Sequence, residues 1–600
     1  MSLDEQLQAL LPRVQKPARY LGNEWNAVHK DHEAAAVRAV IAFPDLYEVG
    51  MSNLGLKILY EAVNARPNML LERVFAPAAD MEVLMRSRRV PLFALESRAP
   101  VAGFDLVGFS LQYELSYTNV LNMLDLAGIP LYSGERDASR PLVAAGGPCA
   151  FNPEPLAPFI DLFLLGDGEE ALPELLEQMI ALRRQGAGRR ETLTGLASLP
   201  GFYVPSFYRP RYTNGFFSGV ERLVETVPAI ITKRTVDNLD AAPYPTAPIV
   251  SHIQAIHDRA VVELFRGCAR GCRFCQAGVI YRPVRRRSPE TLKKLTRQML
   301  RATGYEEVSL ASLSSSDYPA VDRLIGDLAA ELPGGPVKIS LPSLRVDSFS
   351  VGLADQVHQG RRGSLTFAPE AGTARLRRVI GKNISEADLF EAAGAAVTAG
   401  WQAFKLYFMI GLPTETDTDV EEIAALCRKL QDHLRRAYGK KPRLSVSAAV
   451  FVPKPHTPFQ WEPQLPLDQV RRRQRLLGAA LKPLRGVEFN WHDAEASLLE
   501  AVFARGDRRL APLLESAWRA GCRFDGWSEY FSFGRWSETF AALDLDPADW
   551  AYRSYQHDDP LPWDHLAGGL AKEMLVREHR RALLEETGPK EADRDHPDSL

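Results

Sequence analysis

Cysteine is scarce in this chain, with only six among 600 residues. So few cysteines argue against a small scaffold held together by disulfides and favour a reducing, cytoplasmic compartment. The sequence also lacks an apolar run long enough to cross a bilayer, and its first residues show neither the basic nor the apolar segment of a signal peptide. We therefore expect a cytoplasmic protein that works without a membrane.

An excess of positive charge is missing as well. The formal net charge is −3, which excludes an overall basic field for nucleic acid and leaves only local patches for such contacts. Hydrophobic residues make up 46% and charged residues 24%, as in soluble globular proteins. At about 150 residues per domain, the length suggests about four domains. No internal repeat or long low-complexity tract is present.

Half of the cysteines gather in one short stretch. Cys268, Cys272 and Cys275 have the spacing C-x3-C-x2-C, and they follow an apolar run, 260–265, that predicts a buried strand. Glycines in the loop allow the backbone to turn three thiols toward one point. The neighbouring arginines at 266, 270 and 273 favour the thiolate form of the cysteines.

Three thiolates on one loop suit an iron–sulfur cluster with one iron left for another ligand, because such clusters are normally held by four cysteines. The other cysteines, Cys149, Cys427 and Cys522, are far away in sequence. The alternatives are a zinc site or three ordinary buried cysteines. A structural zinc site usually has four protein ligands in two pairs, and no second pair exists here. The spacing therefore favours the cluster.

The C-x3-C-x2-C stretch after a strand closely resembles the signature of the radical S-adenosylmethionine (SAM) superfamily, and Phe274 before the last cysteine fits it. The resemblance implies a 4Fe–4S cluster whose open iron chelates the amino and carboxylate groups of SAM. It further implies reductive cleavage of SAM to methionine and a 5′-deoxyadenosyl radical.

Residues 36–190 alternate between strand-like and helix-like segments, which predicts a doubly wound parallel sheet with ligands at the carboxyl ends of its strands. This part resembles the cobalamin-binding-type domain that precedes many radical SAM cores. The resemblance assigns a cofactor-contacting role to six residues: Asp45, Tyr47, Gly50, Ser110, Gly146 and Gly147. Tyr47 stands where the family has the cobalt-ligating histidine. Cobalamin without a protein ligand, a domain that only covers the active site, and a sheet without a cofactor all stay open.

A second α/β region is expected at 251–460, after a Pro-rich linker at 241–248. Its strands are predicted at 261–265, 307–311, 338–341, 364–368, 403–409 and 444–452. Six β/α units match the partial (β/α)6 barrel of the radical SAM superfamily, with the site above the strand ends. The remaining segments are a helical lead-in at 1–35, a connector at 191–250, a mainly helical region at 461–585 and a disordered tail at 586–600.

Several strand-end residues resemble SAM-contacting motifs of the superfamily. Ser312 and Ser314 would bond the methionine part of SAM, and Ile410 with Gly411 would pack on adenine. Glu370 would bond the ribose hydroxyls or the ammonium group, and Arg375, together with Arg377, would meet the carboxylate. The alternatives are a serine-rich helix cap, a surface ion pair and a plain turn before a helix.

Two further stretches stay ambiguous. Arg282 and the run 285–287 form a basic cluster that could face an anionic substrate or a redox partner, although a solvated face is the commoner explanation. Residues 518–563 are dense in aromatic side chains, which favours a packed core over rings that stack on bases.

Taken together, the motifs resemble an uncharacterised family of B12-binding-type radical SAM proteins. The resemblance implies an enzyme that modifies an unknown substrate, RNA or protein, with methyl transfer as the outcome if cobalamin takes part. A reductant such as flavodoxin or ferredoxin would supply electrons. The alternative is a non-catalytic iron–sulfur or zinc scaffold or assembly protein.

Overall fold

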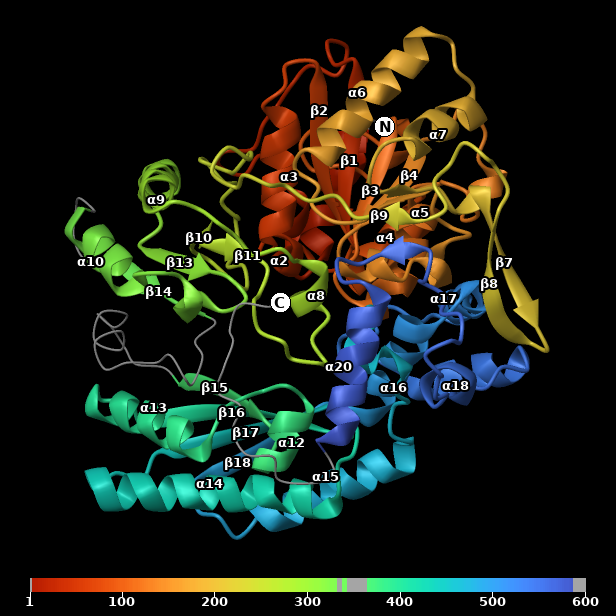
Figure 1. Cartoon of the computed structure of the whole chain (residues 1–600). Helices are drawn as coiled ribbons and strands as arrows, with labels where there is room; N and C mark the ends of the chain where they lie inside the picture. The colour runs from red at the N-terminus through yellow and green to blue at the C-terminus, as the bar shows by residue number, and fades with distance from the viewer. Residues whose placement is uncertain (1–2, 332–336, 343–363, 586–600) are drawn as a thin grey trace.

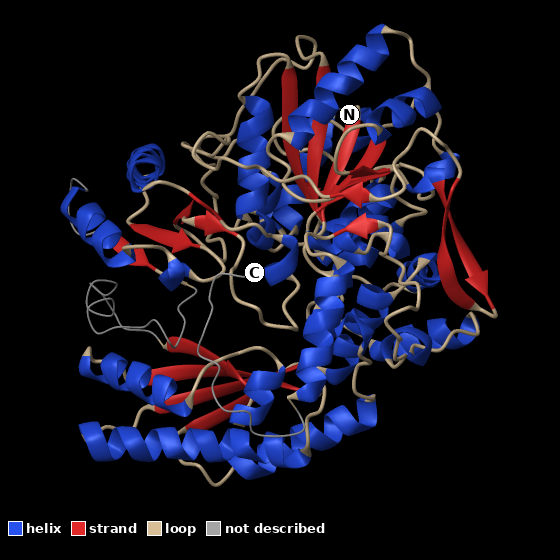
Figure 2. Cartoon of the chain, viewed as in Figure 1, coloured by secondary structure: helices blue, strands red, loops and turns tan. Residues whose placement is uncertain are grey.

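The computed structural model describes residues 3–331, 337–342 and 364–585. Two α/β parts follow one another along the chain (Figure 1). A mainly helical C-terminal region packs against both parts, because α17 (Ala511–Arg519) contacts α5 (Tyr117–Leu126) and α20 (Lys572–Leu584) contacts α12 (Ala374–Val379). Figure 2 shows strands at the centre of each part and helices around them.

The N-terminal part is a six-stranded sheet with the order β2-β1-β3-β4-β5-β6. Its strands are β1 (Val37–Phe43), β2 (Met69–Phe75), β3 (Leu106–Ser110), β4 (Leu142–Gly146), β5 (Leu162–Leu164) and β6 (Phe202–Tyr203). The first five are parallel and β6 is antiparallel. The chain runs from β1 to β2 on one side and then returns to add β3, β4 and β5 on the other side of β1. Open α/β sheets bind ligands where the order of the strands reverses in this way, here between β1 and β3. The predicted doubly wound sheet is confirmed.

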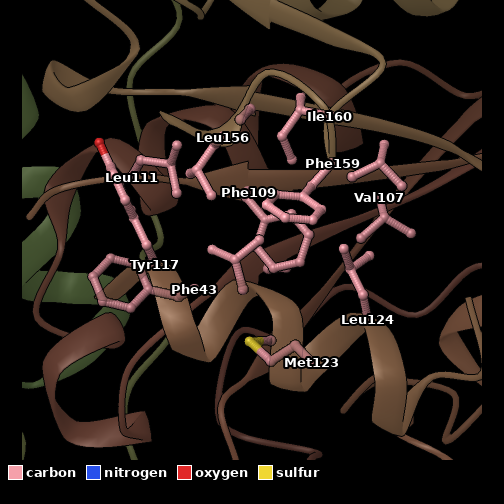
Figure 3. Packing of buried hydrophobic residues seen from close by; sticks show 14 of the residues in the cluster. Phe43, Val107, Phe109, Leu111, Tyr117, Met123, Leu124, Leu156, Phe159 and Ile160 are labelled. Carbon is pink, nitrogen blue, oxygen red and sulfur yellow. The ribbon is translucent and has the colours of Figure 1, made fainter. Parts of the chain in front are cut away.

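The helices of this part are α1 (Leu3–Leu10), α2 (Tyr47–Gly50), α3 (Leu54–Asn64), α4 (Ala79–Arg88), α5, α6 (Ala171–Arg184) and α7 (Arg189–Ala197). Strand residues are buried almost without alternation, as expected for a parallel sheet covered on both faces. Figure 3 shows Val107 and Phe109 of β3 packed with Met123 and Leu124 of α5.

The connector carries a hairpin, β7 (Tyr208–Thr213) and β8 (Phe216–Arg222), followed by the short β9 (Ile231–Thr232). β9 pairs in parallel with β19 (Leu566–Ala567) from the far end of the chain. The C-terminal region is therefore joined to the connector by backbone hydrogen bonds.

The second α/β part contains two separate parallel sheets. One has the order β10-β13-β14 and the other β15-β16-β17-β18, and the described residues form no closed barrel. The strands are β10 (Ala260–Glu263), β13 (Glu307–Ala311), β14 (Lys338–Ser340), β15 (Leu365–Glu370), β16 (Ala403–Ile410), β17 (Arg443–Val450) and β18 (Val487–Trp491). A two-stranded ribbon of β11 (Phe265–Arg266) and β12 (Arg285–Arg286) flanks the first sheet.

The predicted α/β class is confirmed, but the second sheet continues past the expected boundary at residue 460. β18 pairs with β17 from Leu444↔Val487 onward. This strand was not predicted because it is an edge strand without a strong apolar pattern. Its exposed polar residues, such as Glu488 and Asn490, alternate with partly buried ones.

The helices of the second part are α8 (Ala277–Ile280), α9 (Pro289–Thr303), α10 (Val321–Glu331), α12, α13 (Glu386–Thr398), α14 (Asp417–Tyr438) and α15 (Leu467–Leu481). α13 and α14 cover one face of the four-stranded sheet and bury its apolar side chains.

The C-terminal region adds α16 (Ala494–Arg505), α17, α18 (Phe533–Ala542), α19 (Ala548–Ala551) and α20. Trp536, Trp550 and Trp563 are fully buried and join the same core as the N-terminal sheet. The aromatic side chains therefore pack as a core, as expected. The tail predicted to be disordered, 586–600, lies outside the described residues.

Among the residues that the structure describes, no helix combines the length and the apolar character that crossing a bilayer requires.

Candidate functional site

The three clustered cysteines lie on the loop that follows β10 and β11. Cys268, Cys272 and Cys275 are partly exposed, whereas the other three cysteines of the chain are buried. The backbone N–H of Arg270 donates to Sγ of Cys268, and that of Gly278 donates to Sγ of Cys275, both at 3.4 Å. Such N–H donors stabilise negative charge on sulfur.

Burial raises the pKa of the Cys275 thiol to about 11, and the neighbouring thiols of Cys272 and Cys268 add to the shift. Coordination to a metal removes the proton from such a thiol. Within the described residues, no three His, Cys, Asp or Glu side chains are grouped closely enough for a single metal ion. A cluster of several iron atoms holds its cysteines farther apart than one ion does. Three partly exposed thiols on one short loop, two of them with backbone donors, fit the cysteine ligation of an iron–sulfur cluster.

The cysteine loop is held by close backbone contacts. Gly267 has φ +89°, and a Cβ atom there would lie 2.7 Å from the carbonyl oxygens of Tyr281 and Pro283. Gly381 has φ +69°, and its Cβ would lie 2.5 Å from the carbonyl oxygen of Gly271 in the loop. Only glycine allows both approaches.

Arg273 and Phe274 join the loop to the second sheet. The Arg273 backbone N–H donates to the Ile380 carbonyl at 2.9 Å, and its side chain donates to the Val379 carbonyl and pairs with Glu578 of α20. Phe274 packs with a small apolar group at the end of that sheet that includes Leu412. Phe274 thus has a packing role on the face of the loop that meets β15 to β17.

Arg266, just before the loop, connects the two α/β parts. It forms ion pairs with Asp167 at 2.8 Å, Glu169 at 2.8 Å and Glu263 at 3.0 Å. Burial disfavours the Asp167 carboxylate, but Arg266 and Arg285 outweigh this effect and hold the pKa of Asp167 below its usual value. Burial raises the pKa of Glu169 despite Arg266. This network was not predicted. Its one sign in the sequence is the Gly-Asp-Gly-Glu turn at 166–169, which holds two of the carboxylates.

A cavity of about 450 Å³ lies between the N-terminal sheet and the first strands of the second part. Its walls come from the strand ends and loops of the sheet, from the start of α3, and from β10, β11 and the end of β13. The predicted residues Ser110, Gly146, Gly147 and Ser312 line it. Asn53, Leu54, Arg266 and Tyr281 line it as well and were not predicted.

The other predicted residues of the first motif do not line this cavity. Tyr47 is fully buried, and its hydroxyl donates to Glu24 at 2.9 Å. Asp45 accepts from the indole N–H of Trp527 at 2.9 Å. A Cβ on Gly50 would lie 2.2 Å from the Phe75 ring, so this glycine serves packing. The resemblance placed these residues at the cofactor, but the structure uses their polar groups within the fold.

The strand-end serines differ in their surroundings. The Ser312 hydroxyl faces the cavity and bonds Ser315 at 3.1 Å. Ser314 is buried and donates to Asp317 at 2.8 Å, and Asp317 pairs with Arg270 of the cysteine loop at 2.6 Å. Ser314 therefore supports the loop.

Glu370 ends β15 with φ +68°, an unusual backbone conformation for a residue other than glycine. It pairs with Lys382 at 3.3 Å, and burial raises its pKa while Lys382 lowers it. Gly381, which precedes Lys382, approaches Gly271 of the cysteine loop, so the pair lies beside this loop. Lys382 had no motif in the sequence and was missed.

Arg375 and Ile410 point elsewhere. Arg375 donates to the Thr414 carbonyl at 2.9 Å and pairs with Asp419 at 2.5 Å, so it joins α12 to α14. Ile410 is fully buried in the core beneath α13 and α14. The neighbouring Met409 packs near Phe274 instead. Ile410 points into this core and Met409 does not, because successive strand residues point to opposite faces. Arg375 lies on α12, and its ion pair with Asp419 holds it within the fold.

Gly411 has φ +83°, and its N–H donates to Glu415 at 2.7 Å. Burial raises the pKa of Glu415 to about 7, although Arg473 pairs with it at 2.6 Å. Gly411 thus lies in the turn that ends β16, and its contact with adenine stays a prediction.

Polar side chains also cover the face of the second sheet that points away from α13 and α14. Lys405 and Tyr407 of β16 are partly exposed, and the Lys405 ammonium lies 4.9 Å from the Tyr407 ring centre. Ser447 of β17 lies beside Tyr407, and the exposed Asn490 of β18 lies beside Ser447. Met409 shares this face, which therefore borders the cysteine loop.

Two family models match the chain. Residues 55–205 match the N-terminal domain of radical SAM proteins, and residues 262–427, which contain the cysteine loop, match the radical SAM superfamily. The segment that carries the cysteine loop is thus similar to radical SAM domains. The predicted cofactors, a 4Fe–4S cluster and SAM, are those of this superfamily.

Curated relatives include an uncharacterised protein of Methanocaldococcus jannaschii, which is 27% identical over 479 residues, covering 79% of this chain and 90% of that protein. A tRNA-2-methylthio-N(6)-dimethylallyladenosine synthase of Geobacillus thermodenitrificans is 21% identical over 266 residues, 42% of this chain and 47% of that protein.

Similar solved structures include the cobalamin-dependent SAM radical enzyme OxsB with aqua-cobalamin and SAM bound. The TM-score is 0.48 at 13% identity, over 92% of this chain and 79% of that chain. The radical SAM methyltransferase TsrM from Kitasatospora setae, with cobalamin and a 4Fe–4S cluster bound, has a TM-score of 0.45 at 14% identity, over 68% and 74% of the two chains.

Proposed function

We propose that this protein is a radical SAM enzyme that holds a 4Fe–4S cluster on Cys268, Cys272 and Cys275. The observation that carries the proposal is the loop itself. It holds three partly exposed thiols, two of them with backbone donors, within the segment that matches the radical SAM superfamily. The cluster would supply one electron to the SAM sulfonium, giving methionine and a 5′-deoxyadenosyl radical that abstracts hydrogen from substrate.

The residues of the chain bind, orient and shield the reactants. Glu370, set by Lys382, is placed to bond a hydroxyl or ammonium group of SAM. Met409 and the polar face around Tyr407 would lie along bound SAM or substrate. Arg266 and its carboxylate partners would hold the loop against the N-terminal part, which keeps water from the cluster.

The cavity above the N-terminal sheet is the candidate site for cobalamin, with methyl transfer as the reaction. Glycines at 108 and 146 leave space at its floor, and most of its walls are apolar. No histidine occurs among its lining residues. Cobalamin bound there would consequently lack an imidazole ligand from the cavity wall.

The substrate would be RNA or a protein, and a flavodoxin or ferredoxin would deliver electrons. The tRNA-modifying relatives support RNA. The basic cluster near the loop contributes little to partner binding, because Arg285 and Arg287 are buried and bonded within the fold.

A non-catalytic scaffold is the weaker alternative. A purely structural metal site would need no cavity and no strained, partly buried Glu370 beside the loop. Strain of this kind concentrates where ligands bind.

Anaerobic reconstitution with iron and sulfide, followed by dithionite and SAM, tests the proposal. We expect 5′-deoxyadenosine from the wild type and none from the triple variant Cys268→Ala, Cys272→Ala and Cys275→Ala. Cys522→Ala is the matched control, because Cys522 is buried in the C-terminal region. If the reconstituted wild type shows iron–sulfur absorbance but yields no deoxyadenosine, the result favours the non-catalytic scaffold.

A further inference from the structure

A second feature lies at the opposite end of the four-stranded sheet, where β17 and β18 begin. Residues 434–443 contain five lysines and arginines and no acidic residue. Residues 482–486 contain one lysine, one arginine and no acidic residue. All seven side chains are exposed. We call them the basic surface: Arg435, Arg436, Lys440, Lys441, Arg443, Lys482 and Arg485.

The two turns form one continuous surface. β17 and β18 are paired neighbours, and the backbone N–H of Leu444 donates to the Gly486 carbonyl at 2.9 Å. The Gln431 side chain donates to the carbonyls of Pro442 at 3.5 Å and Arg485 at 3.3 Å, one in each turn. α14 and α15, which lead into these turns, also lie side by side (Figure 1).

The charges of the basic surface have no carboxylate partner at ion-pair distance among the described residues. Among the described residues, none of the seven forms an ion pair. Other cations on the same two helices do: Lys429 pairs with Glu386, Arg472 with Asp417 and Arg473 with Glu415. The concentration of positive charge is therefore local, in a chain whose net charge is −3.

The composition of the basic surface points to phosphate groups. Tyr438, 40% exposed, is its one large exposed apolar side chain. A protein interface has a more apolar centre, and a membrane-bound helix needs an apolar face. Arginine forks and lysine ammonium groups in a row match the phosphates of a nucleic acid backbone.

Its position indicates a large partner. β17 has eight residues, which at about 3.3 Å per residue separate its two ends by roughly 26 Å. The basic surface lies at the amino end and the cysteine loop near the carboxyl ends. A ligand that touches both must be longer than this distance, which a small molecule is not.

We propose that the basic surface binds the phosphate backbone of a structured RNA, part of which reaches the cysteine loop. The choice of RNA over DNA rests on the proposed function. The binding itself depends only on the seven side chains and does not require the cluster.

Fluorescence anisotropy of labelled unfractionated tRNA with iron-free full-length protein tests this. The variant replaces Arg435, Arg436, Lys440 and Lys441 with Gln. The control replaces four exposed arginines outside the second part that have no ion pair among the described residues, with Gln: Arg88, Arg184 and Arg190 of the N-terminal part and Arg209 of the connector. Both lose the same charge, and all eight sites are exposed, so both should fold.

We expect the variant to bind at least about tenfold more weakly than the control, with a shallower salt dependence, since each lost phosphate contact lowers the slope by roughly 0.7 to 0.9. Equal affinity of variant and control would overturn the proposal. Polyglutamate or anionic vesicles that displace the tRNA at equal charge concentration would also overturn it, in favour of an acidic protein or a lipid surface. Because no iron is present, failure here would leave the deoxyadenosine test untouched.

Discussion

Asp45–Gly50 and Cys268–Cys275 have opposite roles in the structure, although the sequence predicts a cofactor site for both. Each follows a parallel strand and resembles a cofactor motif. The polar groups of the first segment are used by the fold, since Tyr47 bonds Glu24 and Asp45 bonds Trp527. The cysteine thiols of the second segment are partly exposed. The comparison teaches that a motif can bind a ligand only where the fold has left its donor atoms available.

The difference should appear as a difference in the free energy of unfolding. Substitutions around Tyr47 remove bonds within a buried network and should destabilise the protein. Substitutions of the cysteines should leave the iron-free protein nearly as stable and remove ligand binding instead.

Arg73→Met should have the largest effect. Arg73 is fully buried and pairs with Glu24 at 2.8 Å and Glu96 at 2.6 Å. Removing it leaves two buried carboxylates without their cation, which should lower the free energy of unfolding by about 3–5 kcal/mol. Urea denaturation measures the change. Arg86→Met, which removes a more exposed pair with Glu82, should cost about 1 kcal/mol or less. If both variants lost similar free energy of unfolding, the buried network would stabilise the fold no more than an exposed ion pair does.

Glu24→Gln should come next, with a dependence on pH. Burial disfavours the Glu24 carboxylate, but Arg73 outweighs this and holds its pKa below the usual 4.5. A carboxylate with a lowered pKa stabilises the fold above about pH 4.5, and this contribution is lost as the pH falls through the folded-state pKa. The wild type should therefore lose more stability than Glu24→Gln between about pH 5 and pH 3. Parallel losses in both proteins would contradict the ion pair.

Sequence reasoning recovered the strands with strong apolar patterns and the cysteine loop, because both depend on local composition. It placed β13 and β16 within one residue of their ends. It could not assign Tyr47, Arg375 or Ile410 to their partners. Glu24 is far from Tyr47 in sequence, and Asp419 is far from Arg375. Ile410 points into the core beneath α14, and the pattern did not show which face of the strand this is. The cavity was also beyond reach, since its walls join segments from residue 39 to residue 313.

Tyr47→Phe should have a smaller effect. It removes one hydroxyl bond to Glu24, which keeps Arg73 as a partner, so the free energy of unfolding should fall by about 1 kcal/mol. Because Tyr47 does not line the cavity, the visible spectrum of any cobalamin taken up by the protein should not change. A shifted spectrum would show that Tyr47 contacts the corrin or cobalt.

Cys268→Ala should have the smallest effect on the fold and a complete effect on the cluster. The thiol is partly exposed and accepts only a weak bond from the Arg270 N–H at 3.4 Å. The free energy of unfolding of the iron-free protein should change by about 0.5 kcal/mol or less. After anaerobic reconstitution, bound iron and broad visible absorbance should fall to the level of the triple variant.

Cys522→Ala reverses this pattern and completes the comparison. Its thiol is 2% exposed, so the substitution opens a small void and should cost about 1 kcal/mol, while iron uptake stays at the wild-type level. Stability and iron binding then change in opposite order in two variants that each lose one sulfur atom. If Cys268→Ala destabilised the iron-free protein more than Cys522→Ala did, the cysteine loop would belong to the packed framework, as Tyr47 does, and would no longer stand apart as a ligand site.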